Sequence, residues 1–362
     1  MANGIVFTGG GSAGHVTPNI ALIEAFQAED WQIDYIGSKH GVEKSMISAI
    51  KVAYHSIRCG KLRRYFSWKN IFDPINTVIG IFQAIALLIW IRPRVVFSKG
   101  GFVAFPVVVA AWVCRIPVIA HESDFSPGLA NRLSFPFVQR LCVTFDAAKK
   151  GFKNQKKITV TGTPIRAQLF TGSSAKGLAF CGFNDQKPCV LMMGGGQGSK
   201  ILNACLRAAL DMLGESYQIV HLCGAGHIDP LLLDRKDYFQ IEYANEILAD
   251  LYAMSDLVIS RAGANTVYEL LALNKPHILI PLSRKSSRGD QIQNAEYFSE
   301  QGISRVLAEE TLAPEILFAA IEHTIQEKTE INKKIKVLQI KSATDILVMS
   351  IKEMAAIKRC CQ

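Results

Sequence analysis

The chain has 362 residues, of which 49% are hydrophobic and 20% are charged. This balance excludes an intrinsically disordered protein, and the length exceeds that of a typical single core, so we expect two globular domains. A formal net charge of +9 favours anionic partners such as nucleotide phosphates or an acidic lipid surface. Because the basic residues are scattered, without a long run interleaved with aromatic residues, we expect no nucleic-acid partner.

Short β-branched runs alternate with helix-like segments in both halves, which is typical of doubly wound parallel α/β sheets. In the first half we expect strands at Ile5–Phe7, Ile33–Ile36, Arg94–Phe97, Val118–Ala120 and Leu141–Val143. In the second half we expect them at Val190–Met193, Gln218–Leu222, Phe239–Tyr243, Leu257–Ile259 and Ile278–Ile280. Glycine and proline interrupt this rhythm near Thr161–Pro164, so we predict domains over residues 1–163 and 164–340. A last helix and tail, 341–362, can cap either domain.

The first expected strand runs directly into Gly9-Gly10-Gly11-Ser12-Ala13-Gly14-His15. Glycines let the backbone approach an anion closely, and the following helix directs free N–H groups at the same place. The loop is therefore predicted to hold a phosphate, with His15 beside it as a proton acceptor or, alternatively, only as a cap of the turn. A second loop of this kind, Gly194–Ser199, follows a strand in the second half, which predicts two domains facing one cleft.

An almost entirely apolar segment, Ile79–Ile91, lies in the first half. A membrane span needs about 20 consecutive apolar residues, and this run is interrupted on its N-terminal side by Asp73, Pro74, Asn76 and Thr77. Basic residues flank it at Lys61, Arg63, Arg64, Lys69, Arg92 and Arg94. The segment suits either a helix lying on an anionic leaflet or a buried core helix, and we do not expect it to span the membrane.

Polar clusters follow other expected strands, where open α/β sheets bind ligands. Lys99-Gly100-Gly101-Phe102 follows one strand of the first half, and His121-Glu122-Ser123-Asp124 follows the next. His121 and Glu122 are candidate site residues, although a structural histidine is an open alternative. In the second half, Glu269 follows Ser260-Arg261-Ala262-Gly263, where a carboxylate either accepts hydrogen bonds from a ribose diol or complements the helix dipole.

The nine cysteines are an odd number without a Cys-x-x-Cys pair, which is typical of thiols in a reducing compartment. No histidine or cysteine spacing matches a zinc site, so we expect no bound metal. The N-terminus, Met1-Ala2-Asn3-Gly4, lacks the basic segment of a secretory signal, which predicts a cytosolic protein.

The order of these motifs resembles that of the MurG-type transferases over nearly the whole chain: GGGSAGH, KGGF, HESDFSPGLANR, GTPIR, GGGQGS, SRAGANTVYELL and DQIQNAE. The resemblance implies a GT-B fold of two Rossmann-like domains, the first taking a lipid-diphosphate acceptor and the second taking UDP-N-acetylglucosamine. It implies inverting transfer of N-acetylglucosamine to undecaprenyl-diphosphate-linked muramyl-pentapeptide in peptidoglycan synthesis, without metal or other cofactor. It also implies a peripheral protein on the cytoplasmic face of an anionic membrane.

The resemblance implies roles for single residues of the first domain. Ser12, Ala13 and Gly14 would lie against the donor sugar and the acceptor diphosphate, and Asp124 would meet the sugar. His15 would take the proton of the acceptor hydroxyl as attack on the anomeric carbon proceeds, a role that suits an imidazole with a pKa of about 6.5.

Further roles fall on the rest of the chain. Arg166 and Gly196 would reach the UDP, and Gln291 would bind the hydroxyls of N-acetylglucosamine. Three positions match those that hold the nucleotide phosphate and ribose: Ala264, Thr266 and Glu269. The departing diphosphate is already anionic, so Arg166 and a helix N-terminus can stabilise it without a general acid.

Several positions depart from the usual family pattern. Ser12 and Ala13 replace a threonine and a glycine of GGTGGH, and Gly196 replaces a serine of GGSQGA. Asp124 stands where HEQN has an amide, and Arg284–Gly289 is more basic than usual. Two alternatives therefore stay open: a glycolipid synthase of the same fold with another lipid acceptor, and a non-catalytic, membrane-associated protein that binds UDP-sugar.

Overall fold

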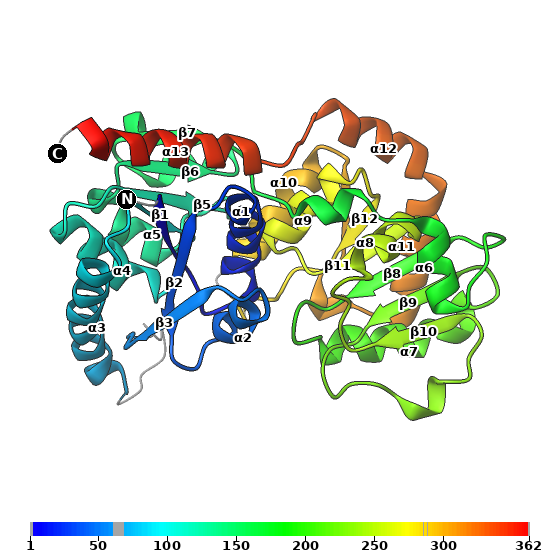
Figure 1. The fold of residues 1–362 in the computed structure, drawn as a ribbon. Coiled ribbons are helices and arrows are strands. Elements are labelled where there is room, and N and C mark those ends of the chain that lie inside the picture. Colours follow the sequence, from blue (N-terminus) through cyan, green and yellow to red (C-terminus); the bar gives the residue numbers. More distant parts are fainter. Residues whose placement is uncertain (1–2, 61–68, 285, 288, 361–362) are drawn as a thin grey trace. The chain divides into compact units, whose positions relative to one another are not determined.

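The computed structural model describes residues 3–60, 69–284, 286–287 and 289–360. The chain forms two compact units, Met1–Arg166 with Ser342–Gln362, and Ala167–Lys341 (Figure 1). The chain therefore passes between the units twice, and the C-terminal helix belongs to the first unit. Hydrogen bonds hold the two passages together, because the Ile165 N–H donates to Ser342 Oγ at 3.0 Å and Thr344 Oγ1 donates to the Ile165 carbonyl at 3.3 Å.

The first unit is built on a seven-stranded parallel sheet in the order β3-β2-β1-β4-β5-β6-β7. Its strands are β1 (Gly4–Thr8), β2 (Gln32–Ser38), β3 (Ala53–Ile57), β4 (Val95–Ser98), β5 (Val118–Glu122), β6 (Arg140–Val143) and β7 (Ile158–Val160). All five strands expected from the sequence are confirmed. The two that the sequence did not predict, β3 and β7, are the edge strands.

Helices cover both faces of this sheet, and alternate residues of each strand point to opposite faces. The helices are α1 (Thr17–Gln27), α2 (Val42–Ala49), α3 (Lys69–Ile91), α4 (Ala104–Val113), α5 (Leu129–Ser134) and α13 (Thr344–Cys360). On one face Phe7 packs in a core with α1 and with Leu347 of α13. On the other face Val6 packs in a core with Leu88 of α3 and Val107 of α4.

The second unit has a six-stranded parallel sheet in the order β10-β9-β8-β11-β12-β13. Its strands are β8 (Cys189–Met193), β9 (Gln218–Leu222), β10 (Tyr238–Ile241), β11 (Leu257–Ser260), β12 (His277–Leu279) and β13 (Ser304–Val306). Its helices are α6 (Ser174–Cys181), α7 (Lys200–Leu213), α8 (Leu248–Met254), α9 (Ala264–Ala272), α10 (Asp290–Glu300), α11 (Pro314–Gln326) and α12 (Lys328–Val337).

Both sheets reverse their strand order beside the first strand, between β1 and β4 and between β8 and β11. In doubly wound sheets the crevice at such a reversal, at the carboxyl ends of the strands, is where ligands bind. The expected α/β class with two doubly wound parallel-sheet domains is confirmed, and each sheet has one such edge for a site.

Helix α3 is long and apolar enough to cross a membrane over Asp73–Ile91, but only a small share of that stretch is buried. Ala84 and Leu88 are fully buried, whereas Phe82 and Trp90 are 68% and 72% exposed. The core-helix interpretation therefore holds for one side of α3 only. The flanking Lys61, Arg63 and Arg64 lie outside the described residues.

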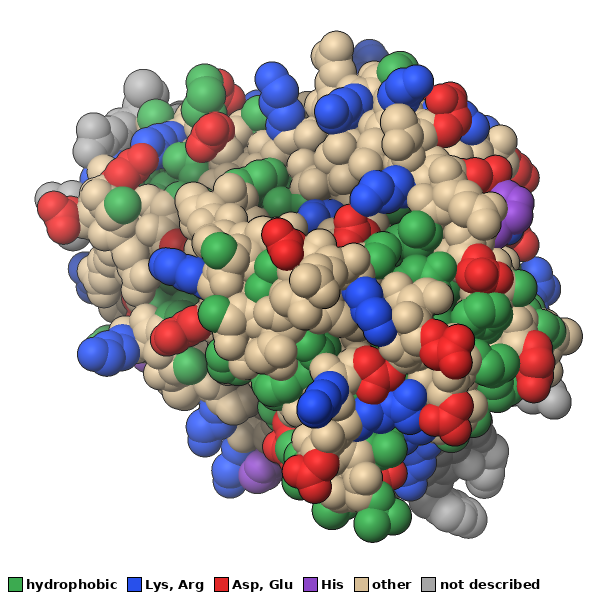
Figure 2. Space-filling model, turned by 90° about the vertical axis from the view of Figure 1, so that its right-hand side faces the viewer, with side chains coloured by type: hydrophobic (Ala, Val, Ile, Leu, Met, Phe, Trp, Pro, Cys, Tyr) green, Lys and Arg blue, Asp and Glu red, His purple; other side chains and the backbone are tan. Residues whose placement is uncertain are grey.

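Charges of both signs share the face drawn in Figure 2, where lysine and arginine side chains are interspersed with aspartate and glutamate. Hydrophobic side chains lie between them. The net positive charge of the chain is therefore not gathered into a single basic patch on this face.

Seven cysteines whose side chains the structure describes, between Cys59 and Cys223, are free thiols, and five of them are buried. Burial raises the pKa of Cys142 and of Cys189 to about 12. Such thiols stay protonated at neutral pH and pack as small apolar side chains.

Candidate active site

The first glycine-rich loop lies between β1 and α1, at the carboxyl edge of the first sheet. The His15 N–H donates to the Ser12 carbonyl at 3.1 Å, which closes a short 3₁₀ turn over Ala13–His15. Ser12 and Gly14 are exposed and His15 is half-buried. The residues assigned to the sugar and diphosphate thus form one accessible turn, and His15 stands at its end.

Two buried side chains, Tyr35 and Asn19, hold the start of this loop by hydrogen bonds. The Tyr35 hydroxyl donates to the Gly9 carbonyl at 2.7 Å, and Asn19 Nδ2 donates to the Thr8 carbonyl at 3.3 Å. Burial raises the pKa of Tyr35, so its phenol stays neutral and keeps donating. The loop is therefore fixed at its start by hydrogen bonds from β2 and α1.

Glu43, a fully buried residue of α2, binds the same loop. Its Oε2 accepts the Gly11 N–H at 3.2 Å, and its Oε1 accepts the Ser38 N–H at 3.0 Å and the Ser38 hydroxyl at 2.5 Å. A Cβ on Gly10 would lie 2.5 Å from the Glu43 carboxyl carbon, so a larger residue there would have to displace this carboxylate. The prediction of a phosphate loop must be corrected in one respect: the Gly11 N–H is already bound to a carboxylate.

The Lys99–Phe102 loop after β4 packs against the first loop. Gly101 has φ +82°, and a Cβ on it would lie 2.1 Å from the Gly10 carbonyl oxygen and 3.2 Å from His15 Cδ2. Glycine is required at this position by both the backbone angle and the contact. The close approach places the imidazole of His15 against the Lys99–Phe102 loop.

Glu122, at the end of β5, organises the loop that carries Asp124. Its carboxylate is 3% exposed and accepts the Asp124 N–H at 3.0 Å, the Gly128 N–H at 2.9 Å and Asn131 Nδ2 at 2.9 Å. Asp124 itself is half-buried. Glu122 therefore holds the loop that carries Asp124 in place. These contacts do not support the expectation that Glu122 faces a ligand.

His121 is a structural histidine. It is fully buried, and its Nε2 lies 2.8 Å from the Gly162 carbonyl oxygen, so this nitrogen carries the proton. Burial and, to a lesser extent, the charge of Lys99 hold the pKa of His121 well below its usual value. The ring is neutral at physiological pH, which fits the structural alternative rather than a contact with ligand.

In the second unit, the Gly194–Ser199 loop connects β8 to α7. The Gly198 N–H donates to the Gly195 carbonyl at 2.9 Å, and a Cβ on Gly198 would lie 2.1 Å from the Cys223 carbonyl oxygen. Gly196 is exposed at the tip of this turn. Its backbone N–H is therefore accessible, although the residue has no hydroxyl.

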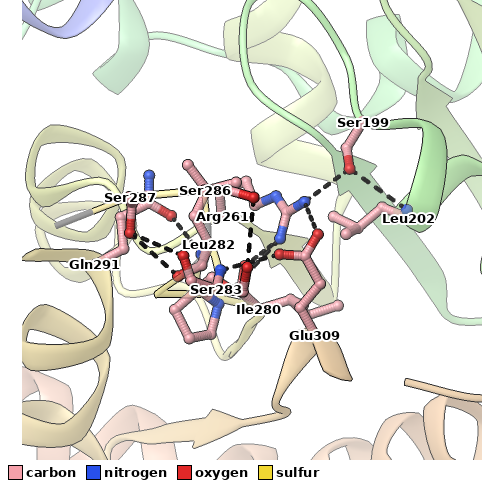
Figure 3. A network of polar contacts seen from close by, with 11 residues as sticks. Ser199, Leu202, Arg261, Ile280, Leu282, Ser283, Ser286, Ser287, Gln291 and Glu309 are labelled. Carbon is pink, nitrogen blue, oxygen red and sulfur yellow. Dashed lines mark hydrogen bonds and ion pairs between the residues drawn. The ribbon is translucent and has the colours of Figure 1, made fainter. Parts of the chain in front are cut away.

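Arg261, at the end of β11, connects this loop to the neighbouring strand ends (Figure 3). The guanidinium is buried, and its Nη2 donates to Ser199 Oγ at 2.8 Å and to Glu309 Oε1 at 2.9 Å. Its Nη1 donates to the Ile280 carbonyl at 3.2 Å. One side chain thus joins the segments that follow β8, β11, β12 and β13.

Glu309 completes this network, because its Oε2 accepts the Ser283 N–H at 3.0 Å. Burial acts to raise the pKa of Glu309, but hydrogen bonds from Arg261 and Ser283 outweigh it and lower the pKa below its usual value. The carboxylate is therefore ionised at neutral pH and fixes the backbone at Ser283, in the segment that follows β12.

Helix α9 begins at Ala264, after Gly263 in an extended conformation. Ala264 is buried, Thr266 is half-buried in the first turn, and Glu269 is 9% exposed one turn further on. Gln291, in the first turn of α10, accepts the Leu282 N–H through Oε1 at 3.0 Å. These side chains lie at the carboxyl edge of the second sheet, beside the segment that Arg261 and Glu309 fix.

Comparison with known proteins identifies the family. The Glycosyltransferase family 28 N-terminal domain matches residues 5–143, and the Glycosyltransferase family 28 C-terminal domain matches residues 189–348. A protein of Legionella pneumophila strain Paris, named UDP-N-acetylglucosamine--N-acetylmuramyl-(pentapeptide) pyrophosphoryl-undecaprenol N-acetylglucosamine transferase, is 59% identical over 99% of both chains. The chain belongs to the MurG family of glycosyltransferases.

Other MurG relatives agree with this assignment. A protein of the same name from Clostridium kluyveri is 48% identical over 95% of this chain and 97% of its own length. The crystal structure of Acinetobacter baumannii MurG matches with a TM-score of 0.75 and 24% identity over 97% of this chain and 99% of that one. The resemblance to MurG-type transferases is confirmed, and the chain is a hexosyltransferase.

Each unit of this MurG-family chain gathers its own set of expected site residues at the carboxyl edge of its sheet. The first unit gathers Ser12, Ala13, Gly14, His15 and Asp124, and the second gathers Gly196, Ala264, Thr266, Glu269 and Gln291. Arg166 lies in the first unit. Burial raises the pKa of Glu24 of α1, and the charge of Arg166 offsets part of that rise.

Sequence reasoning did not assign roles to Glu43, Lys99, Arg261 or Glu309. The sequence pointed to Lys99 and Arg261, since each directly follows an expected strand, in the motifs KGGF and SRAGANTVYELL. No sequence motif pointed to Glu43 or Glu309, because only the fold brings them close to Gly11 and Ser283. Among the described residues, no group of three or more histidine, cysteine or acidic side chains is placed to hold a metal ion.

Proposed function

We propose that this chain transfers N-acetylglucosamine from UDP-N-acetylglucosamine to undecaprenyl-diphosphate-linked N-acetylmuramyl-pentapeptide, the step from lipid I to lipid II in peptidoglycan synthesis. The observation that carries the proposal is the 59% identity, over 99% of both chains, to a relative whose name states these substrates. The two glycine-rich loops, one in each unit, support it because both substrates contain a diphosphate.

The first unit takes the acceptor, and His15 is the general base. The acceptor hydroxyl oxygen forms a bond to the anomeric carbon, the bond from that carbon to the UDP oxygen breaks, and the hydroxyl proton passes to the imidazole. Attack from the face opposite the leaving group inverts the anomeric centre. Ser12, Ala13 and Gly14 orient the diphosphate beside the base, and Asp124 contacts the sugar.

The second unit takes the donor. Glu269 binds the ribose diol, Ala264 and Thr266 bind the nucleotide phosphates at the start of α9, and Gln291 binds the sugar hydroxyls. Gly196 offers its backbone N–H to the UDP, and Arg166 adds a positive charge. Since UDP leaves as an already ionised diphosphate, the start of α9 and Arg166 stabilise it without proton transfer.

The protein works as a peripheral protein on the cytoplasmic face of the membrane, where its lipid acceptor resides. The exposed side chains of α3, including Phe82 and Trp90, form an apolar surface on the first unit. With the net positive charge of the chain, such a surface suits the interface of an anionic leaflet. No nucleic-acid partner is part of this function.

The test is to incubate the purified protein, without added metal, with radiolabelled UDP-N-acetylglucosamine and a short-chain lipid-diphosphate muramyl-pentapeptide. Labelled disaccharide-lipid is the expected product. No product from a folded protein that still binds UDP overturns the proposed acceptor. Transfer to diacylglycerol instead indicates a glycolipid synthase, and tight UDP-sugar binding without turnover on either lipid indicates a sensor.

A further inference from the structure

Lys99 places a buried positive charge beside the first glycine-rich loop. Its side chain is 1% exposed, and its backbone N–H donates to the Thr8 carbonyl at 2.9 Å, at the end of β1. A Cβ on Gly9 would lie 3.1 Å from Lys99 Cβ, so the lysine packs directly against the loop. An ammonium removed from water at this depth needs hydrogen bonds and opposite charges around it.

The loop after β5 supplies both. Lys99 Nζ donates to the Ser123 hydroxyl, and the carboxylates of Glu122 and Asp124 favour its charged form. Burial has the larger effect and lowers the pKa of Lys99 to about 8. The ammonium therefore lies at the junction of the β1, β4 and β5 loops, between the turn that carries His15 and the residue Asp124.

The two carboxylates differ in how they are used. Glu122 accepts hydrogen bonds from the Asp124 N–H, the Gly128 N–H and Asn131 Nδ2. Asp124 is half-buried and stands in the unit proposed to take the acceptor. A carboxylate there repels a diphosphate unless a nearby cation offsets its charge.

We propose that Lys99 is a positioning residue of the acceptor site: its buried ammonium offsets the Asp124 carboxylate and holds the 123–128 loop beside the first glycine-rich loop. The inference rests on the proposed function, because it needs a diphosphate acceptor in the first unit. Lys99 itself does not touch substrate. It allows an acidic residue to stand at position 124 next to a phosphate-binding turn.

The experiment compares Lys99→Met, Lys99→Gln, Asp124→Asn and the double variant Lys99→Met/Asp124→Asn in the full chain. Lys153→Met is the matched control, since Lys153 is exposed in the same unit. Initial rates are measured while the concentration of the lipid-diphosphate acceptor is varied at saturating UDP-N-acetylglucosamine. They are then measured while UDP-N-acetylglucosamine is varied at saturating acceptor. Thermal unfolding of each variant checks that it is folded. Lys99→Gln removes the charge but keeps a donor for Ser123, so it also serves if the methionine variant does not fold.

Losing the charge should raise the KM for the acceptor about tenfold, since a charge effect of this kind is worth roughly one tenfold step in affinity. The KM for UDP-N-acetylglucosamine should stay within about twofold, because Lys99 acts through the acceptor site. Adding Asp124→Asn to Lys99→Met should lower the acceptor KM again. A double variant as poor as Lys99→Met, or an equal rise in both KM values, overturns the inference.

Hydrogen exchange judges the positioning role without turnover. Amides of residues 123–128 should exchange faster in Lys99→Met than in the wild type and in Lys153→Met, while β1 and β4 amides keep their rates. Unchanged exchange in the 123–128 loop overturns the inference. A wild-type protein that makes no product overturns the proposed function instead, so the two failures are distinguishable.

Discussion

Arg261 Nη2 and Glu309 Oε1 form a buried ion pair 2.9 Å long, with side chains only 10% and 7% exposed. Removing one member of such a pair leaves the other as an uncompensated buried charge, which typically costs about 3–5 kcal/mol. The pair also joins Ser199, at the start of α7, to Ser283, in the segment that follows β12. Its loss should therefore disturb both the stability and the donor side of the second unit.

We expect Arg261→Lys to destabilise the second unit by about 3 kcal/mol, because one ammonium cannot reach Ser199, Glu309 and the Ile280 carbonyl together. The KM for UDP-N-acetylglucosamine should rise more than the KM for the acceptor. Calorimetry and substrate titrations measure both effects. Arg140→Lys is the control, since its ion pair with Glu353 lies at the surface and is worth about 1 kcal/mol or less. Equal effects of the two substitutions would contradict this prediction.

The sequence predicted the inner strands of both sheets and one edge strand, β10, and missed three: β3, β7 and β13. All three are edge strands, with the sequences AYHSI, ITV and SRV. A strand buried on both faces reads as a continuous apolar run, whereas an edge strand is short or partly exposed and lacks that signal. The fold class was predictable for this reason, and the extent of each sheet was not.

The place of a candidate site residue in the fold was predictable where chemistry and local sequence coincide. Glycines before a helix marked the Gly9–Gly14 turn, and an acidic residue in a strand-to-helix motif marked Glu269. Glu43 was not predictable, because its role depends on tertiary contacts with Gly11 and Ser38, which belong to two other segments. His121 shows the opposite case: its motif suggested a ligand contact, but burial against the Gly162 carbonyl makes it structural.

Glu43→Gln tests the support of the first loop. The carboxylate accepts three hydrogen bonds from Gly11 and Ser38, whereas a glutamine directs its NH₂ group at a donor of one of these two residues, which costs roughly 1–3 kcal/mol. We expect lower thermal stability of the first unit and a lower kcat, because the turn that carries His15 loses a fixed anchor. Glu29→Gln, at an exposed ion pair with Lys352, should change neither. Wild-type kcat in Glu43→Gln would argue against a role for this anchor in catalysis.

His15→Ala tests the proposed base. Loss of a general base typically lowers kcat about 100- to 10,000-fold. Binding of UDP, measured by calorimetry, should stay within about twofold because the imidazole is proposed to act on the acceptor hydroxyl. His15→Gln keeps a polar side chain in the turn without a titratable base, so it should be as slow as His15→Ala. Near-normal turnover in His15→Gln would leave His15 only the role of capping the turn.

His277 predicts a pH dependence of stability in the second unit. It is fully buried, and burial lowers its pKa to about 4, against a smaller raising effect of its hydrogen bond with the Lys275 carbonyl. In the unfolded chain the His277 imidazole is therefore protonated below pH ~6.5, whereas in the folded chain it is protonated only below about pH 4. The contribution of neutral His277 to the free energy of unfolding is fully present above pH ~6.5 and is lost as the pH falls from there to about 4.

The expected loss is about 3 kcal/mol by pH 4, at roughly 1.4 kcal/mol for each pKa unit. Hydrogen exchange of β12 amides at pH 7 and pH 4 measures it. His277→Asn keeps a donor for the Lys275 carbonyl and removes the titration, so the difference between the two pH values should shrink. An identical difference in wild type and variant would assign the pH dependence to other groups, such as His221, whose pKa burial lowers to about 3.

The exposed side of α3 is the part of the first unit that membrane binding should depend on. Phe82 and Trp90 are exposed, whereas Leu88 is fully buried, so a charge at Leu88 would break the core and say nothing about lipid. We expect Phe82→Glu/Trp90→Glu to reduce sedimentation with phosphatidylglycerol vesicles at least about tenfold, because it removes two large apolar side chains and adds two negative charges.

Leu231→Glu is the matched control, since Leu231 is 93% exposed in the second unit and no membrane role is proposed for it. It should bind vesicles as the wild type does. Turnover of a short-chain, water-soluble acceptor should be unchanged in Phe82→Glu/Trp90→Glu, because α3 is not part of the proposed site. Unaltered vesicle binding in this folded variant would assign membrane attachment to another surface, whereas loss of turnover on the soluble acceptor would show that α3 supports the site itself.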